Sequence, residues 1–282
     1  MKKSLFYLAL FSIGFLGVSL WSFWIIVHTP TIESGREPVD FNLPTEQVTI
    51  SSKDGTALDA LLLASPSETE KVLILLHGYP AEKGDLLPLA STLYPAFSIL
   101  LLDLRSFGKS EGAYTTLGIR ERDDVRVTID FLETRGYRRI GIFGFSLGGA
   151  IALLTAAEDI RVDAVGAYAS FASLRTLGHE TYRNLWILKY PLVELLNFWS
   201  RVWFGTALAK LSPVDAASHI SVPVFLIHTK KDEQIPFSHA LALTDALEEN
   251  PDLETYFPDK GLHGELPVDF NTRLKEFFNH SL

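Results

Sequence analysis

The sequence predicts an α/β fold, a mainly parallel sheet of eight strands with helices on both faces, preceded by one apolar N-terminal helix. Two patterns predict this class. From residue 71 onward, short apolar runs alternate with segments of helical periodicity, as in sheets whose strands are joined by crossover helices. Before them, the 24 residues from Ser4 to Val27 include no charged side chain.

Composition limits the classes of function. The chain has 282 residues, of which 47% are hydrophobic and 21% charged, enough apolar material for a buried core. The net charge is −9 and no basic stripe stands out, so we expect no nucleic-acid partner. The chain has no cysteine, which excludes disulfides, thiolate metal sites and a cysteine nucleophile.

The N-terminal apolar run has the length of a membrane span. As a helix, residues 4–27 would measure about 36 Å, against roughly 30 Å of bilayer hydrocarbon. Lys2 and Lys3 precede the run and favour a cytoplasmic N-terminus, while Trp21 and Trp24 lie near its outer end. We therefore predict that residues 1–27 form a short cytoplasmic stub and an uncleaved signal-anchor, with the rest of the chain extracytoplasmic.

Two alternatives to the anchor remain open. A cleaved signal peptide would give a secreted product, although its apolar region is usually shorter and ends in a small-x-small site. A triplet of this kind, Gly17-Val18-Ser19, lies within the run, but more apolar residues follow it. A buried core helix is the third possibility. Residues 28–45 contain three prolines and predict a linker, and residues 46–282 form the predicted catalytic domain.

The bilayer contact is expected through residues 4–27 alone. After residue 27 the chain carries 23 basic and 34 acidic residues, a net charge of −11. Such a body should not bind an anionic bilayer by charge. No protein partner is indicated.

The domain is predicted to begin with an antiparallel edge, because Asp54-Gly55 between two strand-like runs is typical of a hairpin. The later strands are continuous apolar runs, as expected of strands buried on both faces. The predicted strands are 47–51, 56–64, 71–76, 97–102, 138–143, 162–169, 222–228 and 253–257. The predicted helices are 82–93, 116–134, 147–157, 237–249 and 267–279.

The alternation of strands and helices breaks once, after residue 170. The stretch 171–212 is long, helix-like and aromatic, with Trp186, Trp199 and Trp203. We predict that it forms a helical cap over the carboxyl edge of the sheet. Its aromatic residues indicate an apolar acyl or aromatic substrate, or else simply pack the cap onto the sheet.

The segment Gly144-Phe145-Ser146-Leu147-Gly148 follows an apolar strand and opens a helix. A G-x-S-x-G sequence in this position is typical of a nucleophile elbow, in which the serine occupies a sharp, strained turn. Gly144 and Gly148 let neighbouring backbone segments pass closely. Ser146 is the predicted nucleophile.

A serine hydroxyl needs a general base. His263 lies between the last predicted strand and the last helix, at the carboxyl edge where such sheets present their sites. Asp232 follows the strand 222–228 and is the predicted orienting acid, with Glu233 as a rival. The order Ser146, Asp232, His263 is that of α/β-hydrolases.

A tetrahedral oxyanion needs two backbone N–H donors. One is expected from Leu147, the residue after the nucleophile. The other is expected from the loop after strand 71–76, which reads His77-Gly78-Tyr79-Pro80, and Tyr79 is the predicted donor.

With these residues, the chain resembles the α/β-hydrolase superfamily over about residues 45–282. The stretch Asp103–Gly112 is similar to the D-x-R-x-x-G-x-S segment of that family, which implies structural roles for Asp103 and Arg105. The branch it most resembles is that of membrane-anchored serine hydrolases akin to the dienelactone-hydrolase and prolyl-oligopeptidase-like groups. The loop at His77 is also similar to that of epoxide hydrolases and dehalogenases, but those use an aspartate nucleophile where Ser146 stands.

We therefore expect a serine hydrolase that needs no cofactor and no metal. Its expected substrate is a small-molecule carboxylic ester or thioester, cleaved through an acyl-enzyme. A serine peptidase or amidase of the prolyl-oligopeptidase-like type is the alternative enzyme. A membrane-tethered binding protein without activity is the alternative from another class.

Overall fold

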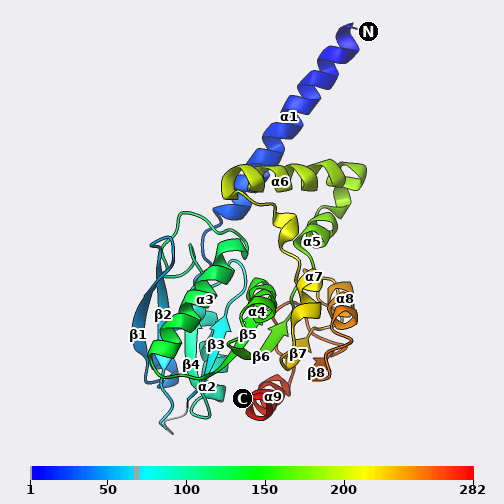
Figure 1. Ribbon diagram of the computed structural model, residues 1–282. Coiled ribbons are helices and arrows are strands. Elements are labelled where there is room, and N and C mark those ends of the chain that lie inside the picture. The colour runs from blue at the N-terminus through cyan, green and yellow to red at the C-terminus, as the bar shows by residue number, and fades with distance from the viewer. Residues whose placement is uncertain (1, 67–69) are drawn as a thin grey trace.

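A computed structural model describes residues 2–66 and 70–282, and within this part of the chain eight strands form one sheet. Their order is β1-β2-β4-β3-β5-β6-β7-β8 (Figure 1). Strands β3 to β8 pair in parallel, whereas β1 with β2 and β2 with β4 are antiparallel. The predicted α/β class and its antiparallel edge are confirmed.

The strands and helices follow the predicted order, with ends moved by up to five residues. The strands are β1 Glu46–Ser51, β2 Ala57–Leu63, β3 Lys71–Leu76, β4 Ser98–Leu102, β5 Arg139–Phe145, β6 Val162–Tyr168, β7 Val224–Ile227 and β8 Leu253–Tyr256. The helices are α1 Lys2–Val27, α2 Leu87–Leu93, α3 Ile119–Thr134, α4 Leu147–Glu158, α5 Leu174–Thr181, α6 Lys189–Phe204, α7 Pro213–Ala216, α8 Ser238–Ala246 and α9 Phe270–Ser281. Short 3-10 turns lie at Pro38–Phe41, Lys83–Leu86, Arg183–Leu188, Leu208–Lys210 and Ala217–His219.

The central strands are buried because helices cover both faces of the sheet. Side chains alternate along a strand, so Ile74 and Leu76 of β3 join the core on the side of α3 and α4. Leu73 and Leu75 join the core on the side of α2 and α9. This explains why β3 reads as a continuous apolar run rather than an alternating one.

Two helices begin later than the sequence predicts, because polar side chains hold the preceding residues. The predicted helix 82–93 starts with a 3-10 turn, in which the Lys83 backbone N–H donates to Asp103 Oδ1 at 2.8 Å. The predicted helix 116–134 starts at Ile119, since Thr115 and Thr116 donate to the carboxylate of Glu121.

The loop after β4 is fixed by buried ion pairs. Asp103 accepts from Lys83 Nζ at 2.5 Å, and a Cβ on Gly108 would lie 2.1 Å from Asp103 Oδ2. Arg105 makes two hydrogen bonds to Asp124 and one to Asp54. The side chains of Asp103 and Arg105 are therefore fully engaged in holding this loop to the sheet.

Helix α1 projects from the domain, and its last turns pack against α6 (Figure 1). The helix spans 26 residues and has a mean hydropathy of 2.0 over its most apolar window. It thus has the length and apolar character of a membrane span. Met1 lies outside the described residues.

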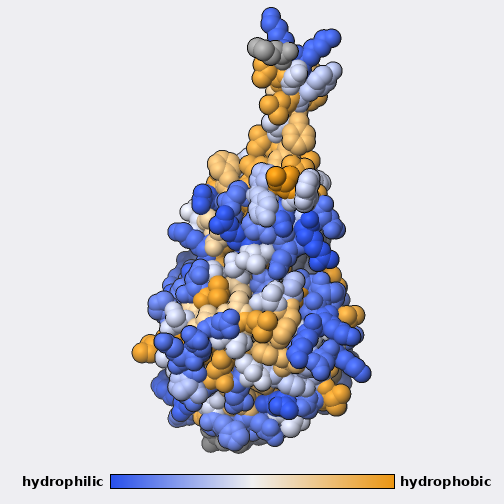
Figure 2. Space-filling model, turned by 90° about the vertical axis from the view of Figure 1, so that its right-hand side faces the viewer, coloured by the Kyte–Doolittle hydropathy of each residue, from blue (hydrophilic) through white to orange (hydrophobic). Residues whose placement is uncertain are grey.

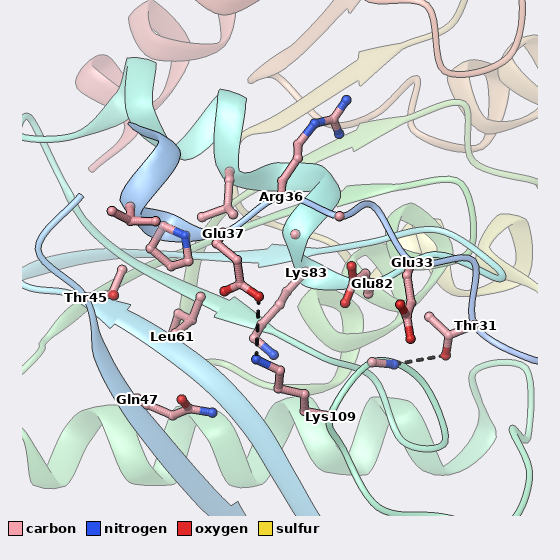
Figure 3. Close-up of a pocket in the computed structure, with 16 residues that line it drawn as sticks. Thr31, Glu33, Arg36, Glu37, Thr45, Gln47, Leu61, Glu82, Lys83 and Lys109 are labelled. Carbon is pink, nitrogen blue, oxygen red and sulfur yellow. Dashed lines mark hydrogen bonds and ion pairs between the residues drawn. The ribbon is translucent and has the colours of Figure 1, made fainter. Parts of the chain in front are cut away.

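The predicted linker 28–45 is not a free spacer. The Ile32 N–H donates to the Pro80 carbonyl at 2.8 Å, and Ser34 donates to Glu82 through its N–H and its hydroxyl. This segment also borders a cavity of about 590 Å³ that Lys83 and Lys109 line from the domain side (Figure 3). Prolines stiffen this segment and its polar groups find partners on the domain, so it lies against the surface.

Candidate active site

Ser146 lies at the sharp turn between β5 and α4. Its backbone has φ 54° and ψ −114°, and its N–H donates to the Tyr168 carbonyl of β6 at 2.8 Å. A Cβ on Gly144 would lie 2.1 Å from the Gly148 carbonyl oxygen, and one on Gly148 would lie 2.4 Å from that of Leu76. Both glycines are therefore required by close backbone contacts, and the strained turn directs the Ser146 hydroxyl outward from the sheet.

The structure brings His263 and Asp232 to this hydroxyl. His263 Nδ1 lies 2.7 Å from Asp232 Oδ2, and His263 Nε2 lies 3.2 Å from Ser146 Oγ. A carboxylate only accepts hydrogen bonds, so Nδ1 donates to Asp232 and Nε2 accepts from the serine hydroxyl. This geometry can remove the hydroxyl proton when the oxygen attacks an electrophile.

Asp232 is held in place by the backbone of its own loop. Its Oδ1 accepts from the N–H groups of Gln234 and Ile235, at 2.9 and 2.8 Å. Burial alone would raise the pKa of this carboxyl, but the hydrogen bonds from His263 and Ile235 outweigh it and leave the pKa lowered. Asp232 is thus kept ionised beside His263.

Glu233, the rival acid, binds a different atom of the same histidine. Its Oε2 accepts from the backbone N–H of His263 at 2.9 Å. The His263 ring packs on Phe145 with centroids 4.9 Å apart. Glu233 and Phe145 therefore position the loop and the ring, while Asp232 alone contacts Nδ1.

The two predicted oxyanion donors border the same cavity as Ser146. Leu147 is the first residue of α4, where the helix dipole favours negative charge, and Tyr79 lies in the loop after β3. His77 of that loop is fully buried: its Nδ1 donates to the Gly78 carbonyl and its Nε2 accepts from the Leu104 N–H. His77 thus fixes the loop that carries Tyr79.

A cavity of about 530 Å³ opens over Ser146 and His263. Its lining includes the apolar side chains of Leu117, Leu174 and Leu177. It also includes the polar side chains of Glu180 and Arg183. The cavity therefore suits a substrate with an apolar part and a polar part.

Sequence reasoning missed two contributors to this cavity. Glu180 of α5 accepts from His239 Nε2 of α8 at 2.7 Å, and the Ala172 N–H donates to His239 Nδ1 at 3.0 Å. Ile26 of α1 also lines the cavity. A lone histidine 59 residues from its carboxylate carries no sequence signal, and neither does one isoleucine within an apolar run.

Comparisons with known proteins agree with this architecture. The family model for the alpha/beta hydrolase fold matches residues 71–187. The protein YqkD of Bacillus subtilis is 28% identical over 62% of this chain, and the match covers 59% of YqkD. The chain therefore spans about three fifths of the length of this curated relative.

Two solved structures share the fold. The esterase Pf2001 of Pyrococcus furiosus superimposes with a TM-score of 0.75 at 22% identity, covering 90% of this chain and 99% of the esterase. The acylaminoacyl peptidase of Pyrococcus horikoshii gives a TM-score of 0.65 at 20% identity, covering 84% of this chain and 41% of the peptidase. With its eight-stranded sheet and these similarities, the chain has the α/β-hydrolase fold.

Proposed function

We propose that this hydrolase cleaves a carboxylic ester or thioester with Ser146 as nucleophile, His263 as general base and Asp232 as orienting acid. The observation that carries the proposal is the continuous chain of hydrogen bonds from Asp232 through His263 to the Ser146 hydroxyl. The strained backbone of Ser146 also supports the proposal, because a serine with only a structural role would not need it.

In the proposed mechanism, Ser146 Oγ attacks the acyl carbon as His263 Nε2 takes its proton. The imidazolium, stabilised by Asp232, then gives this proton to the leaving alcohol or thiol as the tetrahedral intermediate collapses. Water, deprotonated by His263, attacks the acyl-enzyme, and the proton returns to Ser146 as the acid departs.

The oxyanion of each tetrahedral intermediate is assigned to the backbone N–H groups of Leu147 and Tyr79. Fixed donors of this kind stabilise charge that develops only in the transition state, and losing one typically costs about 10²–10³ in rate. The N-terminus of α4 adds to the same stabilisation.

An ester with an apolar acyl chain is our preferred substrate because Leu117, Leu174 and Leu177 line the cavity together with Ser146. Such a lining receives an acyl chain. We further propose that α1 anchors the protein in a membrane, with the N-terminus in the cytoplasm beside Lys2 and Lys3 and the hydrolase domain outside.

The test is a fluorophosphonate probe with a panel of p-nitrophenyl esters and an aminoacyl p-nitroanilide, applied to wild type and to Ser146→Ala. Wild type should label and hydrolyse the esters, and the alanine variant should do neither, with a rate loss of about 10⁴ or more. Labelling that persists in Ser146→Ala would refute the nucleophile. Turnover of the anilide alone would make the protein an amidase.

A further inference from the structure

The C-terminal third of α1 is built into the domain, unlike the rest of that helix. Ser19, Phe23 and Val27 are buried, whereas the apolar residues from Leu5 to Leu16 are largely exposed. Trp199 of α6 donates to Ser19 Oγ at 2.9 Å, and the Phe23 ring packs on Phe204 with centroids 5.5 Å apart. Residues 19–27 of α1 are therefore a part of the hydrolase domain itself.

The end of α1 is tied to the loop that carries the proposed oxyanion donor. The Tyr79 hydroxyl donates to the Ile26 carbonyl at 2.9 Å, and Thr29 also contacts this hydroxyl. The Thr115 N–H donates to the Val27 carbonyl at 3.0 Å. The last carbonyls of α1, which have no partner within the helix, are thus satisfied by residues next to the active site.

A smaller apolar cavity lies beside the one over Ser146 and shares part of its lining. This second cavity of about 190 Å³ is lined by Phe23 and Ile26 of α1 together with Val193 and Leu196 of α6. The two cavities share Ile26, Leu117, Leu174 and Leu177 as walls. Since an apolar cavity of about 150 Å³ accommodates benzene, the second cavity has room for roughly six carbon atoms.

These cavities lie close to the expected bilayer surface. The free part of α1, residues 4–18, measures only about 22 Å as a helix, less than the roughly 30 Å of hydrocarbon that a span must cross. The cap beside it exposes large apolar side chains, among them Trp186, Phe198 and Trp203. Figure 2 shows apolar residues on the projecting helix continuing onto the part of the domain beneath it. When these side chains lie in the bilayer interface, the domain sits deeper and part of residues 19–27 also lies at the depth of the hydrocarbon. Helix α1 is then long enough to cross it.

We propose that the last turns of α1 form a wall of an acyl-chain site, so that the helix anchoring the enzyme also selects substrates with long acyl chains. The proposal rests on the proposed esterase function and names its substrate class, amphiphilic esters with acyl chains of about eight carbons or more. The acyl carbonyl lies at Ser146, the chain runs past Ile26 toward Phe23, and the polar group faces Glu180 and Arg183.

Chain length is the property that this site controls. Each methylene that leaves water gains enough free energy to raise kcat/KM about fourfold when burial is complete. Full-length wild type in detergent should therefore prefer p-nitrophenyl octanoate over the acetate by at least about tenfold in kcat/KM.

The decisive variant is Ile26→Trp, which places an indole where the two cavities meet. It should lower the octanoate-to-acetate ratio of kcat/KM at least about tenfold. The matched control is Ile25→Trp, because Ile25 is the neighbouring residue, is 49% exposed and lines neither cavity. Its ratio should stay within about twofold of wild type.

A second variant, Ile26→Ala, keeps the test decisive if the tryptophan variant does not fold. It enlarges the junction and should raise dodecanoate hydrolysis relative to octanoate. Fluorophosphonate titration of each preparation gives the concentration of active serine. An unchanged chain-length profile in the Ile26 variants, with Ser146 still labelled, would overturn the acyl-site proposal and leave the esterase standing. Absence of labelling and of ester hydrolysis in wild type would overturn both.

Discussion

Two histidine–carboxylate pairs border the same cavity, and they differ in what the second ring nitrogen contacts. In both pairs the nitrogen and the carboxylate oxygen are 2.7 Å apart, His263 with Asp232 and His239 with Glu180. His263 has its other nitrogen 3.2 Å from Ser146 Oγ. His239 has its other nitrogen occupied by the Ala172 N–H.

The difference shows why proximity to a carboxylate does not by itself make a histidine a base. His239 has no nitrogen left for a substrate or a nucleophile, so its bonds fasten α5 of the cap to α8. His77 is likewise satisfied at both nitrogens. Among these three, only His263 presents a ring nitrogen to a hydroxyl, which is the property that proton transfer requires.

The largest expected difference between the two pairs appears when each carboxylate is replaced by its amide. Asp232→Asn should lower kcat about 10⁴-fold, because the amide favours the wrong tautomer of His263 and no longer stabilises an imidazolium. Glu180→Gln should leave kcat within about threefold, because the glutamine oxygen still accepts from His239. Steady-state hydrolysis of p-nitrophenyl butyrate measures both, and equal losses would show that the two pairs do not differ in role.

A smaller effect is expected at the neighbouring acid. Glu233→Gln should lower kcat by no more than about fivefold, because the amide oxygen can replace the carboxylate as acceptor of the His263 backbone N–H. The same assay measures it, with Asp232→Asn as the reference. A loss as large as that of Asp232→Asn would make Glu233 the orienting acid instead.

The smallest effect concerns stability rather than rate. It tests whether the buried histidines His77 and His228 have lowered pKa values. Burial lowers the pKa of His77 and of His228 below the ordinary 6.5. Below about pH 6.5 the unfolded chain therefore binds protons at these residues that the folded protein does not. Stability should be fully present above that pH and fall as the pH drops toward the folded pKa values, by at most about 1.4 kcal/mol per histidine per pH unit.

Thermal unfolding in detergent at pH 7.5 and 5.5 measures this fall. His228→Gln should unfold with a smaller difference between the two pH values, because it removes one of the titrating groups while an amide N–H can still donate to the Ile235 carbonyl that His228 contacts. The exposed His219 supplies the control, and His219→Gln should keep the wild-type difference. If His228→Gln shows the same difference in thermal unfolding between the two pH values as wild type, the assignment of a lowered pKa to His228 is contradicted.

The sequence was sufficient for the sheet and for the residues around Ser146, because each has a local signal. Buried strands such as β3 are runs of apolar residues, and the elbow needs Gly144 and Gly148 at fixed positions around the serine. Helix starts were less predictable. At α3, the start depends on Thr115 and Thr116 binding Glu121, an arrangement that periodicity does not encode.

The contacts of α1 were beyond sequence reasoning for a physical reason. A helix that is apolar on every side gives no sign of which face packs on protein, so the burial of Phe23 and the place of Ile26 had no signal. The surface contacts of residues 28–45 had no signal either, because their prolines and polar residues fit a surface-bound segment as well as a free one.

The central claim is that Ser146 is the residue that becomes acylated. Peptide mapping by mass spectrometry, after wild-type protein has reacted with a fluorophosphonate, tests it most directly. We expect one adduct, on Ser146, that forms at least about 10³-fold more slowly in Asp232→Asn. An adduct on another residue would contradict the role of Ser146 as nucleophile, and equal rates in the two proteins would contradict the role of Asp232.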